Sequence, residues 1–414
     1  MPRLHFFNPG YEAAIYQRTL NYTPPANVRK MRRDLASLPL WYAREEDFVF
    51  LHDECLSEVR HFLAGFPHMA RLFPRLVSRD ELTSKAVSLL PVEVTPWGLS
   101  PDCLHQFERL RTRTGAPLHV PEWKPDYEKL SGRQSAVECM RMLRDKMPDM
   151  SLPPLPGFCA DMRQVAAYLQ ANEPPFVAKA PYSSSGRGLC WITGRTPDRK
   201  SLDWLKGTLA KQEFVCIERA LEKTRDFALE FYSDGEGEIH DSGLSVFDTD
   251  SRGAYAGNRL DDSRVLASCI VRLIGEANYA RVRQSVRDVL RELYGSRYKG
   301  YIGVDMLIYK QADGTHAIHP CVEINMRYTM GIVAHLLYQN WILPGRHGIF
   351  RVVYDGPEGK SLVNHRHMLD TYPPRFESGR FECGYISLCP VKSDTCYRAY
   401  CLIGEENSLV NTTS

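Results

Sequence analysis

The sequence has no long apolar run and no excess of charge of one sign. No stretch of about 18 apolar residues occurs, and the N-terminal segment has no apolar core, so we expect neither a membrane span nor a signal peptide. The formal net charge is +2, with acids and bases well mixed. This balance gives no support for a nucleic-acid or anionic-membrane partner.

The twelve cysteines include no C-x-x-C pair and stand beside no His-x-His cluster. In a chain without a secretion signal, this pattern is typical of reduced, mostly buried thiols, and we expect a cytoplasmic protein. His316, His319 and Cys321 are close in sequence, but only the last two share a strand face, and two ligands do not make a zinc site. His319 instead is a candidate for the lining of a substrate pocket.

Length and pattern predict two or three domains. We expect a smaller α/β domain over residues 1–125, an α+β core over 126–345 and a C-terminal extension over 346–414. The core divides into a small subdomain at about 155–220 and a larger one at about 221–345. Two strand-like runs near the end, Gly384–Leu388 and Tyr397–Ile403, predict a terminal β-hairpin.

Helix signals are clearest at the start of the core. Ser131 and Gln134 have the spacing of a capping box. After them, apolar residues recur at helical spacing and predict one buried face. These residues are Ala136, Val137, Met140, Leu143 and Met147.

A strand ending in Lys179 is followed by a polar glycine loop that returns directly into a second strand. Successive backbone N–H groups of small residues can approach phosphate oxygens, and a lysine adds a positive charge. The loop does not open a helix, so it is not a P-loop. A serine-rich surface turn has the same composition, and this alternative stays open.

Asp305, Glu323 and Asn325 lie on two strands that the turn Asp313-Gly314 joins. Glu323 and Asn325 are two residues apart, so both face one side of the sheet. Two carboxylates and an amide oxygen form an oxygen site suited to Mg²⁺. An exposed polar sheet face is the alternative, although the intervening residues are apolar.

Three further positions are candidates for nucleotide contacts. Arg327 follows Asn325 by two and can reach a phosphate oxygen. Glu218, at the end of another strand, can accept from an adenine amine, although strand ends of this kind are common. Asp226 or Glu230 can hold ribose hydroxyls.

Taken in order, these segments resemble the ATP-grasp superfamily, which includes the D-alanine–D-alanine ligase and biotin carboxylase families. The most specific segment is Val-Glu-Ile-Asn-Met-Arg, which is similar to the family pattern Glu-x-Asn-x-Arg. Phe-Val-Ala-Lys-Ala-Pro with Ser-Ser-Ser-Gly-Arg-Gly resembles the phosphate lysine and its flap. Cys-Ile-Glu-Arg-Ala-Leu resembles the adenine hinge, and Gly-Val-Asp-Met-Leu-Ile-Tyr resembles the strand with the first metal carboxylate.

The resemblance implies an ATP-grasp fold of two α+β subdomains behind a smaller α/β domain. It implies an ATP-dependent ligase that activates a carboxylate as an acyl-phosphate and joins it to an amine, releasing ADP and phosphate. A kinase or a carboxylase with the same nucleotide site, and a non-catalytic nucleotide-binding scaffold, are the alternatives. A homodimer is a common arrangement in this superfamily.

Site roles follow residue by residue from the resemblance. Asp305, Glu323 and Asn325 hold Mg²⁺, and Arg327 and Lys179 act on the reacting phosphates. The remaining ATP contacts are Arg133, Ser183, Ser184, Ser185, Gly186, Gly188, Glu218, Ala220, Leu221 and Asp226. Arg133 stands where lysine is common in the family.

Overall fold

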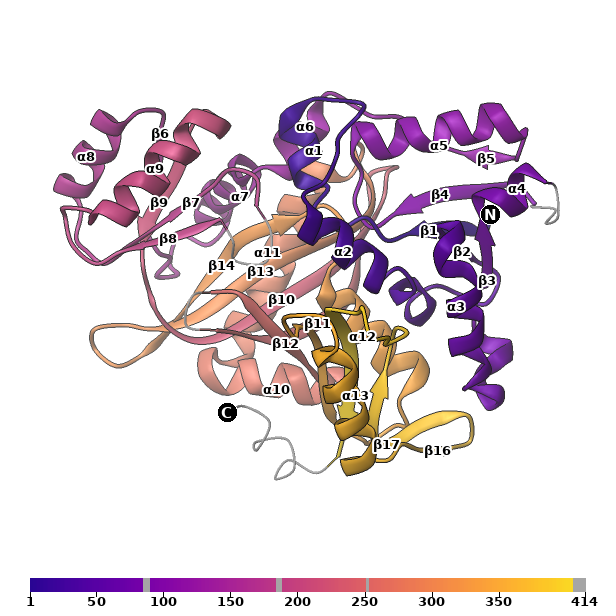
Figure 1. Cartoon of the computed structure of the whole chain (residues 1–414). Helices are drawn as coiled ribbons and strands as arrows, with labels where there is room; N and C mark the ends of the chain where they lie inside the picture. The colour runs from indigo at the N-terminus through magenta and orange to yellow at the C-terminus, as the bar shows by residue number, and fades with distance from the viewer. Residues whose placement is uncertain (85–89, 184–187, 251–252, 405–414) are drawn as a thin grey trace. The chain divides into compact units, whose positions relative to one another are not determined.

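The computed structural model describes residues 1–84, 90–183, 188–250 and 253–404 (Figure 1). The chain forms two compact units that do not follow chain order. The first unit contains residues 1–123, 256–262 and 332–414, and the second contains 124–255 and 263–331. Within the described residues, every helix is too short or too polar to cross a membrane.

The N-terminal part of the first unit is a five-stranded parallel sheet with the order β3-β2-β1-β4-β5. Its strands are β1 (Arg3–Phe6), β2 (Phe48–Leu51), β3 (Arg75–Ser78), β4 (Val92–Pro96) and β5 (Leu118–His119). Its helices include α1 (Glu12–Gln17), α2 (Ala26–Asp34), α3 (Asp53–Ala64), α4 (Arg79–Thr83) and α5 (Pro101–Thr114). Apolar residues of strands and helices form one core, with Phe50 on β2 and Phe107 on α5 in edge-to-face contact. The predicted α/β character of this part is confirmed.

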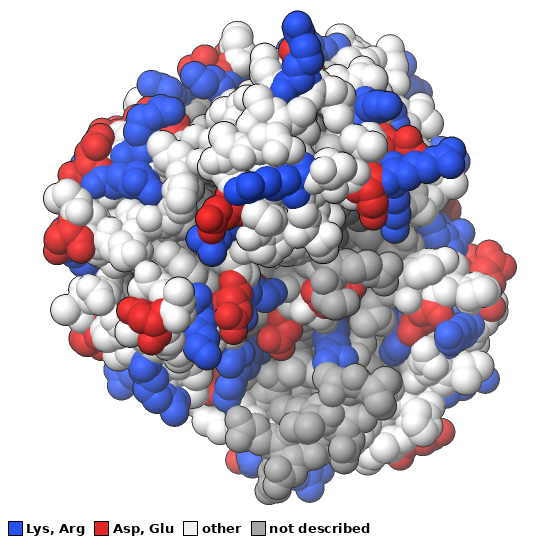
Figure 2. Space-filling view, turned by 90° about the vertical axis from the view of Figure 1, so that its left-hand side faces the viewer, with Lys and Arg blue, Asp and Glu red and all other residues white. Residues whose placement is uncertain are grey.

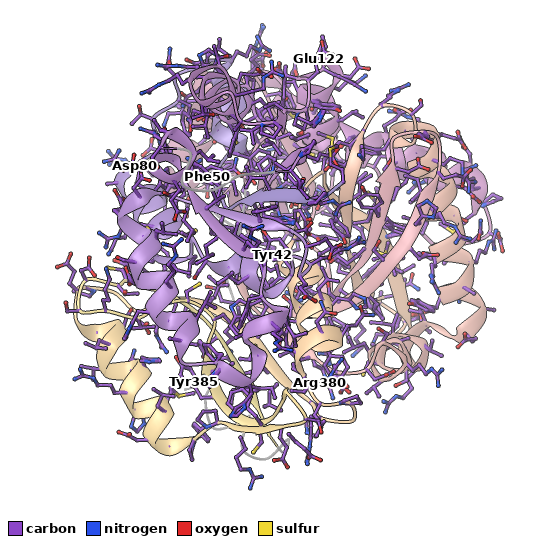
Figure 3. The ribbon with its side chains drawn as sticks, turned by 90° about the vertical axis from the view of Figure 1, so that its right-hand side faces the viewer. Tyr42, Phe50, Asp80, Glu122, Arg380 and Tyr385 are labelled. Carbon is purple, nitrogen blue, oxygen red and sulfur yellow. The ribbon has the colours of Figure 1, made fainter. Side chains whose placement is uncertain are left out.

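The same unit contains a set of mostly C-terminal strands in the order β12-β15-β18-β17-β16. These are β12 (Tyr255–Leu260), β15 (Gly348–Tyr354), β16 (Arg375–Glu377), β17 (Arg380–Ser387) and β18 (Tyr397–Ile403). The helix α12 (Met330–Trp341) precedes β15 in the chain, and α13 (Lys360–Thr371) lies between β15 and β16. β17 and β18 pair antiparallel, which confirms the predicted terminal hairpin. Figure 3 shows Arg380 and Tyr385, both on β17, in this C-terminal part.

Two tryptophans connect the C-terminal strands to the N-terminal part of this unit. Trp41 donates from Nε1 to the carbonyl of Leu388 at 2.6 Å. Trp341 donates from Nε1 to the carbonyl of Trp41 at 2.8 Å, and the two indoles meet edge to face. Both side chains are buried, so residues some 300 positions apart share one interior.

The second unit contains a small antiparallel sheet with the order β6-β9-β7-β8. The strands are β6 (Gly157–Cys159), β7 (Phe176–Lys179), β8 (Leu189–Ile192) and β9 (Val215–Arg219). One face of this sheet, with Phe176 and Ala178 of β7 and Ile217 of β9, packs in a core with residues of two helices. These helices are α8 (Met162–Ala171) and α9 (Arg199–Gln212). Since side chains alternate along a strand, Val177, Lys179 and Glu218 point to the opposite face.

The larger sheet of this unit has antiparallel strands in the order β14-β13-β10-β11. The strands are β10 (Glu222–Asp234), β11 (Ile239–Thr249), β13 (Lys299–Lys310) and β14 (His316–Asn325), and the helices α10 (Ser263–Ile274) and α11 (Glu276–Tyr294) pack on it. On β10 and β13 the residues of one face, such as Phe227 and Val304, are buried and apolar. The alternate face carries Glu230 and Asp305. The predicted α+β class is confirmed.

The expected capping box at Ser131 is wrong. Ser131 is the last residue of α6 (Asp126–Ser131), and the N-cap of α7 (Arg133–Lys146) is Gly132, which has no capping side chain. The helix begins one residue later than the pattern indicated, because Ser131 belongs to the preceding short helix. The predicted apolar face is confirmed: Ala136, Val137, Met140, Leu143 and Met147 are all buried.

Candidate active site

Lys179 is the last residue of β7 and is 6% exposed. It forms a close ion pair with Glu218 on the adjacent strand β9. Nε2 of His319, from β14 of the larger sheet, lies 3.9 Å from the other oxygen of Glu218. Burial alone would raise the pKa of Glu218, but the charge of Lys179 and the bonds from His319 and Lys179 outweigh it and hold that pKa at about 2. Glu218 is therefore ionised and compensates the buried lysine.

Arg133, at the start of α7, connects the loop after β7 to the strand β14. Its Nε donates to the carbonyl of Ala180 at 2.8 Å, and Nη2 donates to Oγ of Ser183 at 3.4 Å. The same Nη2 lies 3.6 Å from Oε2 of Glu323. The arginine side chain is 6% exposed. One guanidinium group thus contacts both the loop after β7 and Glu323 on β14.

Asp305 and Glu323 are direct partners in the register of β13 and β14, and Asn325 is the partner of Gly303. Nδ2 of Asn325 donates to Oδ2 of Asp305 at 3.1 Å, and its Oδ1 accepts from Nη2 of Arg327 at 2.8 Å. The sequence placed these side chains close together. In the structure Asp305, Asn325 and Arg327 form one hydrogen-bonded group, and Glu323 lies in register beside Asp305.

Burial and the neighbouring charges of Glu323 and Glu230 raise the pKa of Asp305 well above its ordinary value. Two adjacent carboxylates of this kind are stabilised by a cation between them. Within the described residues, no three His, Cys, Asp or Glu side chains group closely enough to hold a metal alone. Mg²⁺ commonly uses one or two carboxylates together with waters and nucleotide phosphates, so Asp305 and Glu323 fit such an ion.

The other residues predicted to contact the nucleotide lie after β9, at the base of the loop after β7, and on β10. Ala220 and Leu221 follow β9 directly, and the N–H of Ala220 is already bonded to the carbonyl of Pro175 at 2.8 Å. The carbonyl of Gly188 accepts from the N–H of Ala180 at 2.8 Å, which closes the base of the loop. Ser184, Ser185 and Gly186 lie outside the described residues.

Asp226 has a different environment. It contacts Lys223, and its Oδ2 accepts from Oγ1 of Thr249 at 3.0 Å. The contacts of Asp226 are therefore with the start of β10 and the end of β11 and not with Lys179 or Asp305.

Glu230 has an environment that the sequence pattern did not predict. It lies between the buried residues Leu229 and Phe231 and is itself 1% exposed. Its partners Ser245 and Thr329 come from β11 and from the segment after β14. The sequence signal was a lone carboxylate in an apolar strand, but its partners are 15 and 99 residues away.

No known protein-family profile matches the sequence, and no curated protein matches it. Solved structures do match. Biotin carboxylase from Campylobacter jejuni, in a complex with beta-gamma-ATP, is similar over 100% of this chain and 90% of its own, with 10% identity and a TM-score of 0.53. Pyruvate carboxylase from Rhizobium etli, with the activator acetyl coenzyme A, is similar over 100% of this chain and 37% of its own, with 14% identity and a TM-score of 0.51.

N5-carboxyaminoimidazole synthetase from Staphylococcus aureus, complexed with ADP, covers 99% of this chain and 95% of its own at 11% identity. Its TM-score is 0.48. At such identities the likeness to the two carboxylases is one of fold. It agrees with the order of the segments in the sequence: the chain has the ATP-grasp fold.

Proposed function

We propose that the protein is an ATP-dependent ligase that activates a substrate carboxylate as an acyl-phosphate and joins it to an amine. The main support is the hydrogen-bonded group Asp305–Asn325–Arg327. Glu323 lies in register beside Asp305, and Arg133 lies between Glu323 and the loop after Lys179. Two arginines, one from α7 and one just after β14, thus lie beside the carboxylate and amide oxygens of β13 and β14. Such an arrangement suits the positioning and charge neutralisation on which phosphoryl transfer depends. The shared fold with a biotin carboxylase complexed with beta-gamma-ATP supports ATP as the co-substrate.

The residues of this chain have complementary tasks in the proposed reaction. Lys179 and Arg133 bind the phosphate chain, and Arg327 neutralises charge on the group being transferred. The backbone around Ala220 and Leu221 borders the adenine. Asp305, Glu323 and the oxygen of Asn325 would hold Mg²⁺, which supplies charge neutralisation at the phosphates when bound.

The proposed chemistry needs no nucleophilic side chain. The substrate carboxylate attacks the γ-phosphorus, the bond to the β-phosphate oxygen breaks and ADP leaves. The amine then displaces phosphate from the acyl-phosphate. The main contributions of the protein are therefore positioning and charge neutralisation.

Phosphorus NMR with Mg-ATP and a small-metabolite extract tests the proposal. We expect ADP and inorganic phosphate to appear only with extract, and to be lost in Lys179→Ala and Glu323→Ala. Lys206→Ala, which changes an exposed lysine on α9, is the matched control and should turn over normally. A new phosphoester signal would indicate a kinase, and AMP with pyrophosphate would exclude an acyl-phosphate route.

We further propose a cytoplasmic protein that acts on small molecules. All twelve cysteines are free thiols, ten of them buried, which suits a reducing compartment. On the face shown in Figure 2, Lys and Arg side chains are interspersed with Asp and Glu. This mixture does not favour nucleic-acid binding. Sedimentation would test the homodimer that is common in the superfamily.

A further inference from the structure

Glu230 is a buried acid with two neutral hydrogen-bond partners. Oε1 accepts from Oγ of Ser245 at 3.1 Å, and Oε2 accepts from Oγ1 of Thr329 at 3.0 Å. Ser245 is 2% exposed and Thr329 is 6% exposed. The carboxyl group therefore connects β10 to β11 on one side and to the segment after β14 on the other.

Two glycines leave room for this carboxyl group. A Cβ at Gly331 would lie 2.0 Å from Oε1 of Glu230, and a Cβ at Gly303 would lie 2.7 Å from Oε2. The Cβ at Gly331 would also lie 2.4 Å from Oγ of Ser245. Any side chain at position 331 would therefore displace the acid or its partner. The local sequence is adapted to the presence of a carboxyl group at this point.

The segment that Glu230 holds is the one that carries Arg327. Thr329 follows Arg327 by two residues, and Nη1 of Arg327 donates to the carbonyl of the intervening Tyr328 at 3.0 Å. The arginine is thus bonded to its own segment as well as to Asn325. A shift of Thr329 would move the backbone on which the guanidinium depends.

We propose that Glu230 is a positioning residue that sets the location of Arg327 at the phosphate site by holding the Arg327–Thr329 segment against β10 and β11. The inference rests on the proposed function only in assigning Arg327 to a nucleotide phosphate. Electrostatics agree with the geometry, because the charge of Arg327 lowers the pKa of Glu230 against the effect of burial, and Glu230 contributes to the raised pKa of Asp305. The acid is therefore within electrostatic range of the candidate site.

A double-mutant cycle on Mg-ATP binding separates positioning from a general loss of packing. We expect Arg327→Ala to weaken binding about tenfold and Glu230→Gln to weaken it about three- to tenfold. If Glu230 acts through Arg327, the double variant binds within about twofold of Arg327→Ala alone. Independent, multiplying effects would overturn the inference.

Matched variants keep the test decisive if Glu230→Gln folds poorly. Thr329→Val removes the hydroxyl and keeps the shape, and we expect it to couple to Arg327→Ala in the same way, while Thr329→Ser restores wild-type binding. Asp355→Asn, which changes an acid of the first unit whose side chain is 7% exposed and bonded to Arg398, controls for loss of a paired carboxylate and should leave Mg-ATP affinity unchanged. Additive effects for Thr329→Val would also overturn the inference.

The binding cycle does not depend on turnover. A non-additive cycle in a protein that forms no ADP would support the role of Glu230 and reject the ligase. ADP formation together with an additive cycle would reject the role of Glu230 alone. A wild-type protein that does not bind Mg-ATP would reject both.

Discussion

Lys179 and Glu218 form an ion pair whose side chains are only 7% and 13% exposed. They lie on antiparallel neighbouring strands and on the face of the small sheet opposite its apolar core. A lysine in such surroundings needs an anion. Glu218 supplies it in the free protein, and a nucleotide phosphate can supply it when ATP is bound.

This relationship predicts a ligand-dependent stability defect. Glu218→Gln leaves Lys179 without its carboxylate, and breaking a buried pair costs about 3–5 kcal/mol. We expect a lowered melting temperature that Mg-ATP restores more strongly than it raises that of the wild type, because phosphate replaces the lost anion. Differential scanning fluorimetry with and without Mg-ATP measures the effect. Glu222→Gln, at an exposed position of β10, is the control, and an equal nucleotide response in all three proteins would contradict the prediction.

We expect the carboxyl group of Asp305 to lower the stability of the fold while it serves the proposed Mg²⁺ site. Because burial and the charge of Glu323 raise its pKa, ionisation of this carboxyl group destabilises the folded state. Asp305→Asn should therefore raise the melting temperature of the metal-free protein by about 2–4 °C, the effect of about 1 kcal/mol in a domain of this size. The same variant should lose Mg²⁺-dependent ADP formation. A lower melting temperature would show that the carboxylate stabilises the fold.

Because Glu230 is buried, we expect the free energy of unfolding to depend on pH. Burial raises its pKa from 4.5 to about 7, so between these values the folded protein binds more protons than the unfolded chain. Stability contributed by this group therefore falls as pH rises from about 4.5 to 7, by about 1.4 kcal/mol per pH unit at most. Urea unfolding of wild type and Glu230→Gln at several pH values isolates the contribution. An unchanged difference between the two proteins across this range would refute it.

The hydrogen bonds of Asp34, at the end of α2, lead us to expect that α2 and the strand β18 stabilise each other. Its Oδ2 accepts from the N–H groups of Cys396 and Tyr397 at 2.8 and 3.1 Å. Asp34→Ala leaves both donors without this acceptor, and we expect a loss of about 2–4 kcal/mol. Faster amide exchange in β18 would locate the effect. Glu46→Ala, at a 59% exposed side chain, should change stability little.

Local patterns in the sequence predicted several elements correctly. The hairpin around Asp313-Gly314 is present as β13 and β14, and the helical stripe from Ala136 to Met147 is buried. Alternation along β14 placed Glu323 and Asn325 on one face, where the register confirms Asp305 as a neighbour. These predictions depended on periodicities of two and 3.6 residues, which act within a few residues of chain.

The predicted capping box at Ser131 was wrong because the same local pattern fits two different structures. Ser131 and Gln134 have the required spacing, but whether Ser131 ends one helix or caps the next depends on the preceding segment. In the structure α6 extends through Ser131, and Gly132 separates the two helices. Spacing alone does not distinguish a junction of two helices from the start of one.

The sequence by itself determined the order of the site residues, their alternation on strands and the ATP-grasp fold that this order indicates. Only the tertiary structure decided that Glu218 is paired with Lys179, that Glu230 is held by Ser245 and Thr329, and that residues 332–414 share a compact unit with residues 1–123. The physical reason is range: backbone periodicity is a local property, whereas the burial of a charge and the choice of its partner depend on segments distant in the chain.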